Sequence, residues 1–201
     1  KDDIKNIKSQ RVYWKHNLKV GNEFITKDNI NDVVQRFNVP KNLGLLSLDI
    51  DGVDYWVLKE LSALKPSIII CEYNSLFGEK KSITVPYKKN FIRSKEHYSN
   101  LYYGASIQAF TDIMKTKNYF LIGTNTAGNN AFFVRKDLWK ILNKMILNKK
   151  IFMSKFRESR DQKGNLSFLD KKKSLELIKN KHIIDLNDKN KKKLELKLLN
   201  L

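Results

Sequence analysis

The chain has 201 residues, of which 41% are hydrophobic, and this length and composition predict one domain with a substantial core. The single cysteine, Cys71, excludes an internal disulfide and any cysteine-cluster metal site. The longest apolar runs are far shorter than the roughly 20 residues needed to cross a membrane, and the first residues are polar rather than typical of a signal peptide, so we expect a cytoplasmic protein.

The formal net charge is +18, from 39 lysines and arginines against 21 acidic residues. A charge of this size can attract nucleic acid or an anionic membrane surface. The lysines are nevertheless spread along the chain without regularly interleaved aromatic residues, and asparagine and isoleucine are abundant with them. A genome rich in A and T explains that combination, so we favour a compositional origin of the charge over a nucleic-acid interface.

The first forty residues predict two helices and one short strand. Residues 4–16 have apolar side chains at mixed helical spacing, and residues 24–26 form a strand candidate. A second helix is expected from an N-cap at Asp28 or Asn29 to about residue 37. Its apolar residues follow the i, i+3, i+4, i+7 spacing of a buried stripe: Ile30, Val33, Val34 and Phe37.

A strand–helix–strand unit is predicted next. Residues 45–50 are apolar on both faces of a strand, which is typical of a buried parallel strand. Residues 53–64 have the pattern of a helix that ends before Pro66, and residues 67–73 form a second buried strand. The three elements fit within about 30 residues, the size of a βαβ unit, so we expect the two strands to be parallel.

A long loop, a helix and a hairpin are predicted downstream of this unit. Residues 75–103 form a polar and aromatic loop, and loops of this length are usually functional or disordered. Residues 104–117 predict a helix. Residues 119–123 and 131–134 predict strands, and their short polar connector favours an antiparallel pair. A further helix is expected at residues 138–147.

The sequence changes character near residue 149. We therefore divide it into a domain at residues 1–148 and a basic, partly helical C-terminal extension at residues 149–201. Residues 175–184 predict a short helix within this extension. Residues 189–201 alternate lysine with leucine, which is typical of a solvated helix or a frayed tail.

Two acids one residue apart, Asp49 and Asp51, follow the first buried strand and precede Gly52. Ligands of α/β proteins bind at the carboxyl ends of strands, so acids at this position are candidates for a site. In a purely structural interpretation, Asp51 caps the next helix, Gly52 permits a tight turn and Asp54 favours the positive end of the helix. That interpretation is weaker for Asp49, because a charge at the end of so apolar a strand needs a partner or a ligand.

Two functional interpretations rest on the Asp-x-Asp spacing itself. In the first, the motif resembles the nucleophile loop of haloacid-dehalogenase-type phosphatases, with Asp49 as nucleophile and Asp51 as acid and base. That chemistry needs a later strand that ends in acids to bind magnesium, and no strand predicted after Glu72 ends in an acidic pair. In the second, the motif resembles the metal-binding Asp-x-Asp of nucleotide-sugar glycosyltransferases, which the helical pattern after Gly52 does not favour.

A third interpretation takes in the residues that follow. Residues 45–61 resemble the fourth-strand motif of FkbM-like S-adenosylmethionine-dependent methyltransferases, in which a strand ends in Asp-x-(Glu or Asp)-Gly and leads into a helix. Residues 67–74 resemble the fifth strand, residues 104–117 the next helix, and residues 119–134 the terminal antiparallel pair of that fold. The resemblance covers residues 20–137. It implies an α/β, Rossmann-like, mostly parallel sheet with a terminal antiparallel hairpin.

The resemblance also implies S-adenosylmethionine as cofactor. Two cofactor-binding features of the family cannot be placed in this sequence: the glycine-rich loop after the first strand and the acid after the second strand. No Gly-x-Gly precedes residue 20, the nearest glycine is Gly21, and no early strand ends in an acid. We therefore expect the chain to be the C-terminal portion of the fold, without its first two strands. In that form it would bind cofactor poorly or not at all.

Site residues follow from the same resemblance, which implies O-methylation of a saccharide or another small molecule. Asp49 and Asp51 are expected to contact the cofactor at the crevice where methyl donor and acceptor meet. Asp49 and Glu72 are the catalytic candidates, because a carboxylate there can act as general base toward an acceptor hydroxyl. The expected acceptor-binding residues are Asn74, Tyr87, His97, Tyr103 and Asn125. No metal ligand is expected under this interpretation.

Two alternatives stay open. Glu72 can instead form an ion pair with one of the many lysines. The chain as a whole can be a non-catalytic module that lacks the cofactor half of the fold and uses its positive charge to bind a polyanion.

Overall fold

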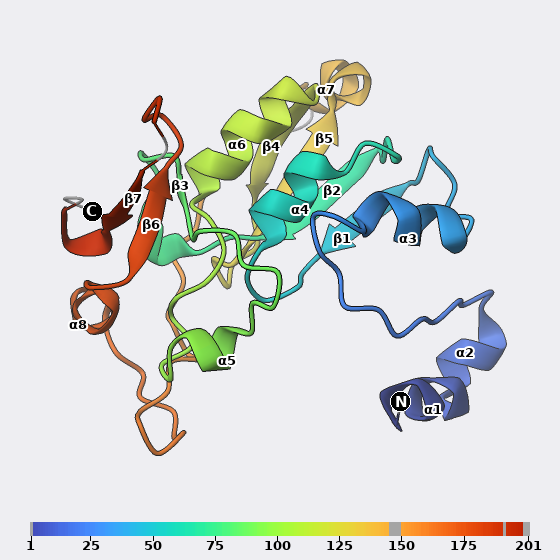
Figure 1. Ribbon diagram of the computed structural model, residues 1–201. Helices are drawn as coiled ribbons and strands as arrows, with labels where there is room; N and C mark the ends of the chain where they lie inside the picture. The colour runs from blue at the N-terminus through green and yellow to red at the C-terminus, as the bar shows by residue number, and fades with distance from the viewer. Residues whose placement is uncertain (1, 145–149, 191, 199–201) are drawn as a thin grey trace.

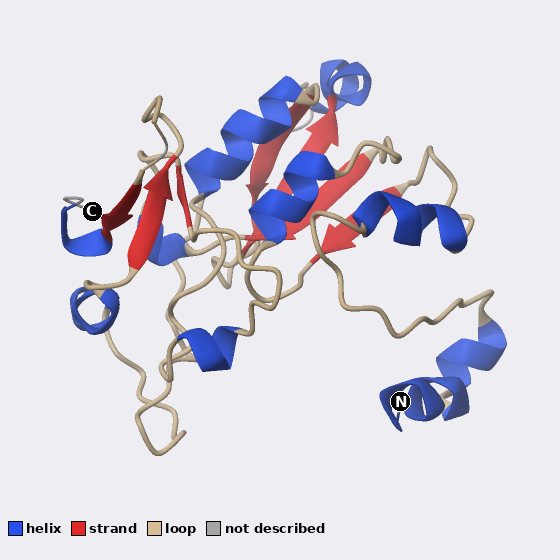
Figure 2. Ribbon diagram, viewed as in Figure 1, coloured by secondary structure: helices blue, strands red, loops and turns tan. Residues whose placement is uncertain are grey.

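The computed structural model describes residues 2–144, 150–190 and 192–198. Its main sheet has four strands in the order β1-β2-β5-β4 (Figures 1 and 2). The strands are β1 (Leu45–Leu48), β2 (Ile68–Glu72), β4 (Tyr119–Thr124) and β5 (Asn130–Arg135). β1 and β2 are parallel, whereas β5 is antiparallel to both β2 and β4. The predicted βαβ unit and terminal antiparallel pair are therefore confirmed, but the sheet is mixed rather than mostly parallel, because β5 runs against both of its neighbours.

The helix between the parallel strands is shorter than the sequence predicts. α4 spans Asp54–Glu60 rather than residues 53–64. The side-chain amide of Asn31 donates to the carbonyl of Glu60 at 3.0 Å, and its oxygen accepts from the backbone N–H groups of Ser62 and Ala63, also at 3.0 Å. These bonds replace the next helical turn. The apolar pattern continues because Leu61 and Leu64 remain buried outside the helix.

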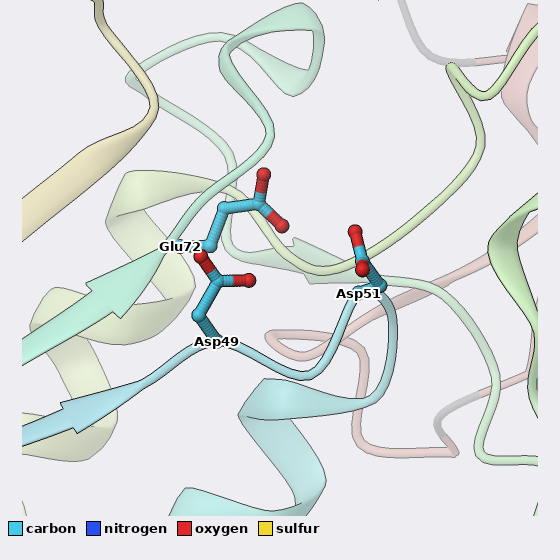
Figure 3. Close-up of side chains that lie close together, drawn as sticks. All are labelled: Asp49, Asp51 and Glu72. Carbon is cyan, nitrogen blue, oxygen red and sulfur yellow. The ribbon is translucent and has the colours of Figure 1, made fainter. Parts of the chain in front are cut away.

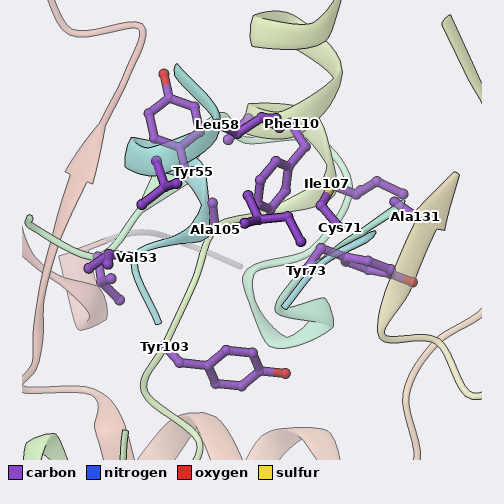
Figure 4. Close-up of a cluster of buried hydrophobic side chains, with 14 of the residues drawn as sticks. Val53, Tyr55, Leu58, Cys71, Tyr73, Tyr103, Ala105, Ile107, Phe110 and Ala131 are labelled. Atoms are coloured by element: carbon purple, nitrogen blue, oxygen red, sulfur yellow. The ribbon is translucent and has the colours of Figure 1, made fainter. Parts of the chain in front are cut away.

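α4 and α6 (Ile107–Thr116) lie side by side over one face of the sheet (Figure 1). The Ser106 hydroxyl begins α6 by accepting from the N–H of Ala109 at 3.1 Å, as an N-cap does. Leu58 of α4 and Phe110 of α6 pack in the same buried cluster as Cys71 of β2 (Figure 4). Cys71 is fully buried, as predicted, and burial raises the pKa of its thiol well above the usual range.

The N-terminal region differs from the prediction in two places. Residues 4–16 form two helices, α1 (Asp2–Ser9) and α2 (Arg11–Lys15), because Gln10 has an extended backbone between them. The predicted strand at residues 24–26 is absent from this part of the structure. Thr26 instead forms a turn with Asn29, whose side chain accepts from the Thr26 N–H at 2.7 Å. That turn leads into the predicted helix, α3 (Ile30–Arg36).

The long loop at residues 75–103 contains three short elements, and one of them belongs to a second sheet. These are the 3₁₀ helix η1 (Ser75–Phe77), β3 (Ile83–Thr84) and α5 (Arg93–Glu96). β3 pairs antiparallel with β6 (His182–Asp185), which pairs antiparallel with β7 (Lys193–Glu195). The loop is therefore fixed by residues about 100 positions later in the chain.

The described part of the C-terminal segment packs against the main sheet and the core. The backbone carbonyl of Lys150 accepts from the Thr124 N–H at 3.1 Å, and that of Phe152 accepts from the Tyr73 hydroxyl at 2.8 Å. α8 (Lys171–Ile178) and β6 each contribute fully buried residues, Ile178 and Ile183, to the core.

The two remaining helices are short. α7 spans Lys136–Leu142 and begins two residues before the predicted helix, whose last positions, 145–147, lie outside the described residues. The 3₁₀ helix η2 spans Leu196–Leu198. Among the described helices, none has the length and apolar character to cross a membrane.

Gly52 allows the ring of Phe91 to pack against the loop after β1. A Cβ atom at residue 52 would lie 2.1 Å from Cδ1 of Phe91. We expect Gly52→Ala to lower the free energy of unfolding by about 1–3 kcal/mol, the usual cost of overpacking, as measured by urea denaturation. The control is the same substitution in a Phe91→Ala background, where the added methyl group has room. An equal loss in both backgrounds would contradict the steric explanation.

Candidate functional site

The loop after β1 is held by the helix that follows it. β1 ends at Leu48, and Asp51 has a left-handed backbone with φ of 57°, a conformation that aspartate tolerates. The buried carboxylate of Asp54 accepts from the N–H groups of Ile50 and Gly52, each at 2.9 Å. The N-cap of α4 is Val53. The interpretation of Asp51 as a helix cap is therefore wrong, and Asp54 orders the loop from inside the helix.

Three carboxylates meet at the carboxyl ends of the parallel strands. Leu48 pairs with Cys71, so the residues that follow them, Asp49 and Glu72, lie side by side at the same edge of the sheet. Asp49, Asp51 and Glu72 each have a carboxylate oxygen within 4.8 Å of the others (Figure 3). Asp49 and Asp51 are exposed, whereas Glu72 is only 5% exposed.

Arg93, the first residue of α5, is the cation that faces this cluster. Its Nη1 lies 3.0 Å from Oδ1 of Asp51 and 3.4 Å from Oε1 of Glu72. Its Nε donates to the carbonyl of Asn100 at 2.7 Å, and its guanidinium lies 3.6 Å from the centre of the Tyr103 ring. Nη2 is 3.5 Å from the carboxylate of Glu158. One guanidinium thus contacts three carboxylates.

Burial makes this cluster electrostatically costly. Burial, helped by the charges of the neighbouring acids, raises the pKa of Glu72 to about 8, although the charge of Arg93 opposes this shift. Burial and the charge of Asp51 also raise the pKa of Asp49. Among the atoms that the structure describes, Oε2 of Glu72 is buried and has no hydrogen-bond partner. The arrangement therefore favours a proton or a further cation.

A cavity of about 400 Å³ adjoins the cluster, a volume within the range of small-molecule sites. Glu72 and Arg93 form one side of it, and Tyr103 lines it as well. The β4–β5 turn and residues 154–159 of the C-terminal segment line it too. A second cavity, of about 370 Å³, shares Arg93 and Glu158 with the first and reaches Asp51.

Two of the predicted acceptor-binding residues line the first cavity. They are Asn74 and Tyr103. The amide of Asn74 donates to the carbonyls of Leu101 and Tyr103 at 2.9 and 3.0 Å, and its oxygen accepts from the Leu76 N–H at 3.1 Å. The polar groups of Asn74 are therefore used to hold the loop in place, and the ring of Tyr103 supports Arg93.

The other three predicted residues make contacts elsewhere. The oxygen of Asn125 accepts three backbone N–H groups of its own turn, each at 3.1 Å, while neighbouring residues of that turn reach the cavity. The Tyr87 hydroxyl donates to Asp28 at 3.0 Å. Nδ1 of His97 lies 2.7 Å from the Ser99 hydroxyl, and burial lowers the pKa of this histidine.

Sequence reasoning missed Arg93 and Glu158 as site residues. Arg93 stands in a loop without periodicity, and Glu158 stands in a charge-rich stretch typical of a solvated surface. The one signal for a partner was the burial expected of Glu72, which requires a cation or a proton nearby.

No protein-family model, curated protein or solved structure matches the chain. The resemblance to FkbM-like methyltransferases therefore remains a prediction.

Asp54 should give folding stability an unusual pH dependence. Burial raises its pKa from 3.8 to about 6, so between these values the folded protein keeps a proton that the unfolded chain has released. Stability from this residue is therefore greatest below about pH 4 and falls as the pH rises toward 6. We expect the wild type to lose roughly 2 kcal/mol relative to Asp54→Asn between pH 4 and 7, as measured by urea unfolding.

The control for this measurement is Asp137→Asn. Asp137 is exposed and paired with Arg135, and hydrogen bonding to this partner lowers its pKa. Asp137 contributes to stability at pH values above its ordinary pKa. The difference in the free energy of unfolding between the wild type and Asp137→Asn should therefore stay constant from pH 4.5 to 7. A flat difference for Asp54→Asn over the same range would contradict the assignment.

Proposed function

We propose that the protein transfers a methyl group from S-adenosylmethionine to a hydroxyl of a saccharide or another small molecule. The observation that carries the proposal is the parallel β1–α4–β2 unit, which brings Asp49, Asp51 and Glu72 together beside a cavity of about 400 Å³. The order of elements after residue 43 and the terminal antiparallel pair of β4 and β5 support the same interpretation.

The hydrogen-bond acceptors of the site suit such a ligand. Asp49 and Asp51 present exposed carboxylates, which accept hydrogen bonds from the hydroxyl and amino groups that the cofactor carries. When bound, S-adenosylmethionine supplies the electrophilic methyl group. Glu72 lines the cavity, so its carboxylate, once it has released the proton that burial favours, is assigned as the acceptor of the hydroxyl proton. The Tyr103 ring and the β4–β5 turn form walls against which an acceptor would pack.

The test begins with cofactor binding. We expect saturable binding of S-adenosylmethionine in titration calorimetry with the natural full-length protein, and affinity about tenfold lower in Asp49→Asn, because a neutral amide accepts hydrogen bonds less well than a carboxylate. Asp137→Asn, which removes a carboxylate at the opposite edge of the sheet, should bind as the wild type does. Absence of binding by the full-length protein would refute the proposal.

The second measurement addresses Glu72. Transfer of a labelled methyl group to hydroxylated acceptors should fall about 100-fold in Glu72→Gln, because the proton acceptor is lost, while the affinity for S-adenosylmethionine stays close to that of the wild type. An unchanged transfer rate would contradict the assignment of Glu72 as proton acceptor but would not contradict methyl transfer itself.

The three clustered carboxylates favour a second candidate, magnesium-dependent hydrolysis of a phosphate ester. In that reaction Asp49 would be the nucleophile and Asp51 the acid and base. The ion pair of Asp51 with Arg93 would have to open first. This candidate requires hydrolysis of a simple phosphate monoester that depends on added Mg²⁺ and disappears in Asp49→Asn.

A further inference from the structure

We propose that Asp49, Asp51 and Glu72 bind one hard divalent cation of the Mg²⁺, Mn²⁺ or Ca²⁺ class. The inference concerns the three carboxylates themselves and does not depend on methyl transfer. Each residue offers one oxygen, and carboxylate oxygens are the ligands that these ions prefer.

The spacing of the oxygens suits a single ion. All three lie within 4.8 Å of one another. Two oxygens on opposite sides of a calcium ion are about 4.8 Å apart, and two on opposite sides of a magnesium ion about 4.2 Å apart, because the metal–oxygen distances are near 2.4 and 2.1 Å. No two of these oxygens are therefore too far apart to share one calcium ion. Because three ligands cannot all lie opposite one another, the exposed side chains of Asp49 and Asp51 must draw the oxygens closer together, and more so for magnesium or manganese.

Glu72 provides an independent reason to expect a ligand. Its side chain is 6% exposed, and its Oε2 has no hydrogen-bond partner among the residues that the structure describes. The side chain of Glu72 extends from the end of β2 to the side on which Asp51 lies (Figure 3). A buried carboxylate oxygen without a partner is unfavourable unless a proton or a cation binds to it.

The balance of charges around the cluster also favours a further cation. Asp49, Asp51 and Glu72 form the cluster, and Arg93 pairs with two of these acids and with Glu158, so one guanidinium is shared among three carboxylates and Asp49 has no ion pair with it. Asp54 lies below the loop with its oxygens engaged by backbone N–H groups. Lys155 and Arg157 line the neighbouring cavity, but the ion pairs of the cluster itself are made by Arg93.

Two features keep the carboxylates in place. The pairing of Leu48 with Cys71 fixes Asp49 beside Glu72, and the Asp54 carboxylate fixes the backbone on both sides of Asp51. Ligands that are held in position before binding lose little entropy when the ion arrives. The bound ion would take over the charge compensation that the Arg93 guanidinium now provides to Asp51 and Glu72.

The test is direct titration of the folded protein with Mn²⁺, followed by calorimetry and by the loss of the free-ion paramagnetic resonance signal. We expect one saturable site with a dissociation constant below about 1 mM, in the range of modest carboxylate sites. Affinity should fall about tenfold or more in Asp49→Asn and in Glu72→Gln. Mg²⁺ and Ca²⁺ added as competitors then show which ion the site prefers.

Asp51→Asn guards against a folding artefact, because the Asp51 side chain is 68% exposed and its loss leaves the core intact. This variant should keep the wild-type circular dichroism spectrum and still bind Mn²⁺ about tenfold more weakly. Asp137→Asn carries the same charge change at the opposite edge of the sheet and should bind within about twofold of the wild type, as expected for a screened surface charge.

Two results would overturn the proposal. One is the absence of saturable binding by the folded wild type up to about 10 mM Mn²⁺, well above the usual range for such sites. The other is equal affinity in the wild type, Asp51→Asn and Glu72→Gln. Binding of S-adenosylmethionine is measured separately in a metal-free buffer with chelator, so a failure of the cation site and a failure of methyl transfer give different patterns.

Discussion

The parallel register of β1 and β2 creates a conflict between like charges, and the surrounding structure is arranged to relieve it. Two strands that run in the same direction end at the same edge, so Asp49 and Glu72 lie next to each other. Water screens the exposed carboxylate of Asp49 but not that of Glu72, which is buried. Arg93 must therefore approach closely, and its stacking on Tyr103 and its bond to Asn100 hold it there.

The conformation of the loop between β1 and α4 is determined by residues to which no role in the proposed reaction is assigned. Asp54 supplies acceptors for two backbone N–H groups that the end of the strand leaves free. Gly52 leaves space for the Phe91 ring, which ties the beginning of α4 to the long loop that bears Arg93. The positions of the acids and of their cation are thus linked through packing as well as through charge.

Local pattern and the ends of strands were sufficient to predict much of this architecture. The buried strands at residues 45–48 and 68–72, the intervening helix and the hairpin at residues 119–135 all follow from apolar runs and their punctuation. The carboxylates of Asp49 and Glu72 could be placed together for the same reason, because parallel strands share an edge.

The remaining features depend on contacts between distant parts of the chain, which periodicity does not reveal. α4 ends early because Asn31, about 30 residues upstream, takes over its backbone bonds. β3 is only two residues long and exists through its pairing with β6. Arg93 and Glu158 reach the site from irregular segments, so neither has a local signature. The mixed sheet arises because β5 lies between β2 and β4, a pairing with β2 that no residue of β5 encodes on its own.

The cavity wall at residues 154–159 has a consequence for how such a protein can diverge. These residues reach the site through an irregular segment, whereas the acids stand at the ends of paired strands. Loops accept substitution and changes of length far more readily than buried strands do. Changes in this short stretch can therefore alter the ligand preference of the cavity while the sheet and the acids at the ends of its strands stay the same.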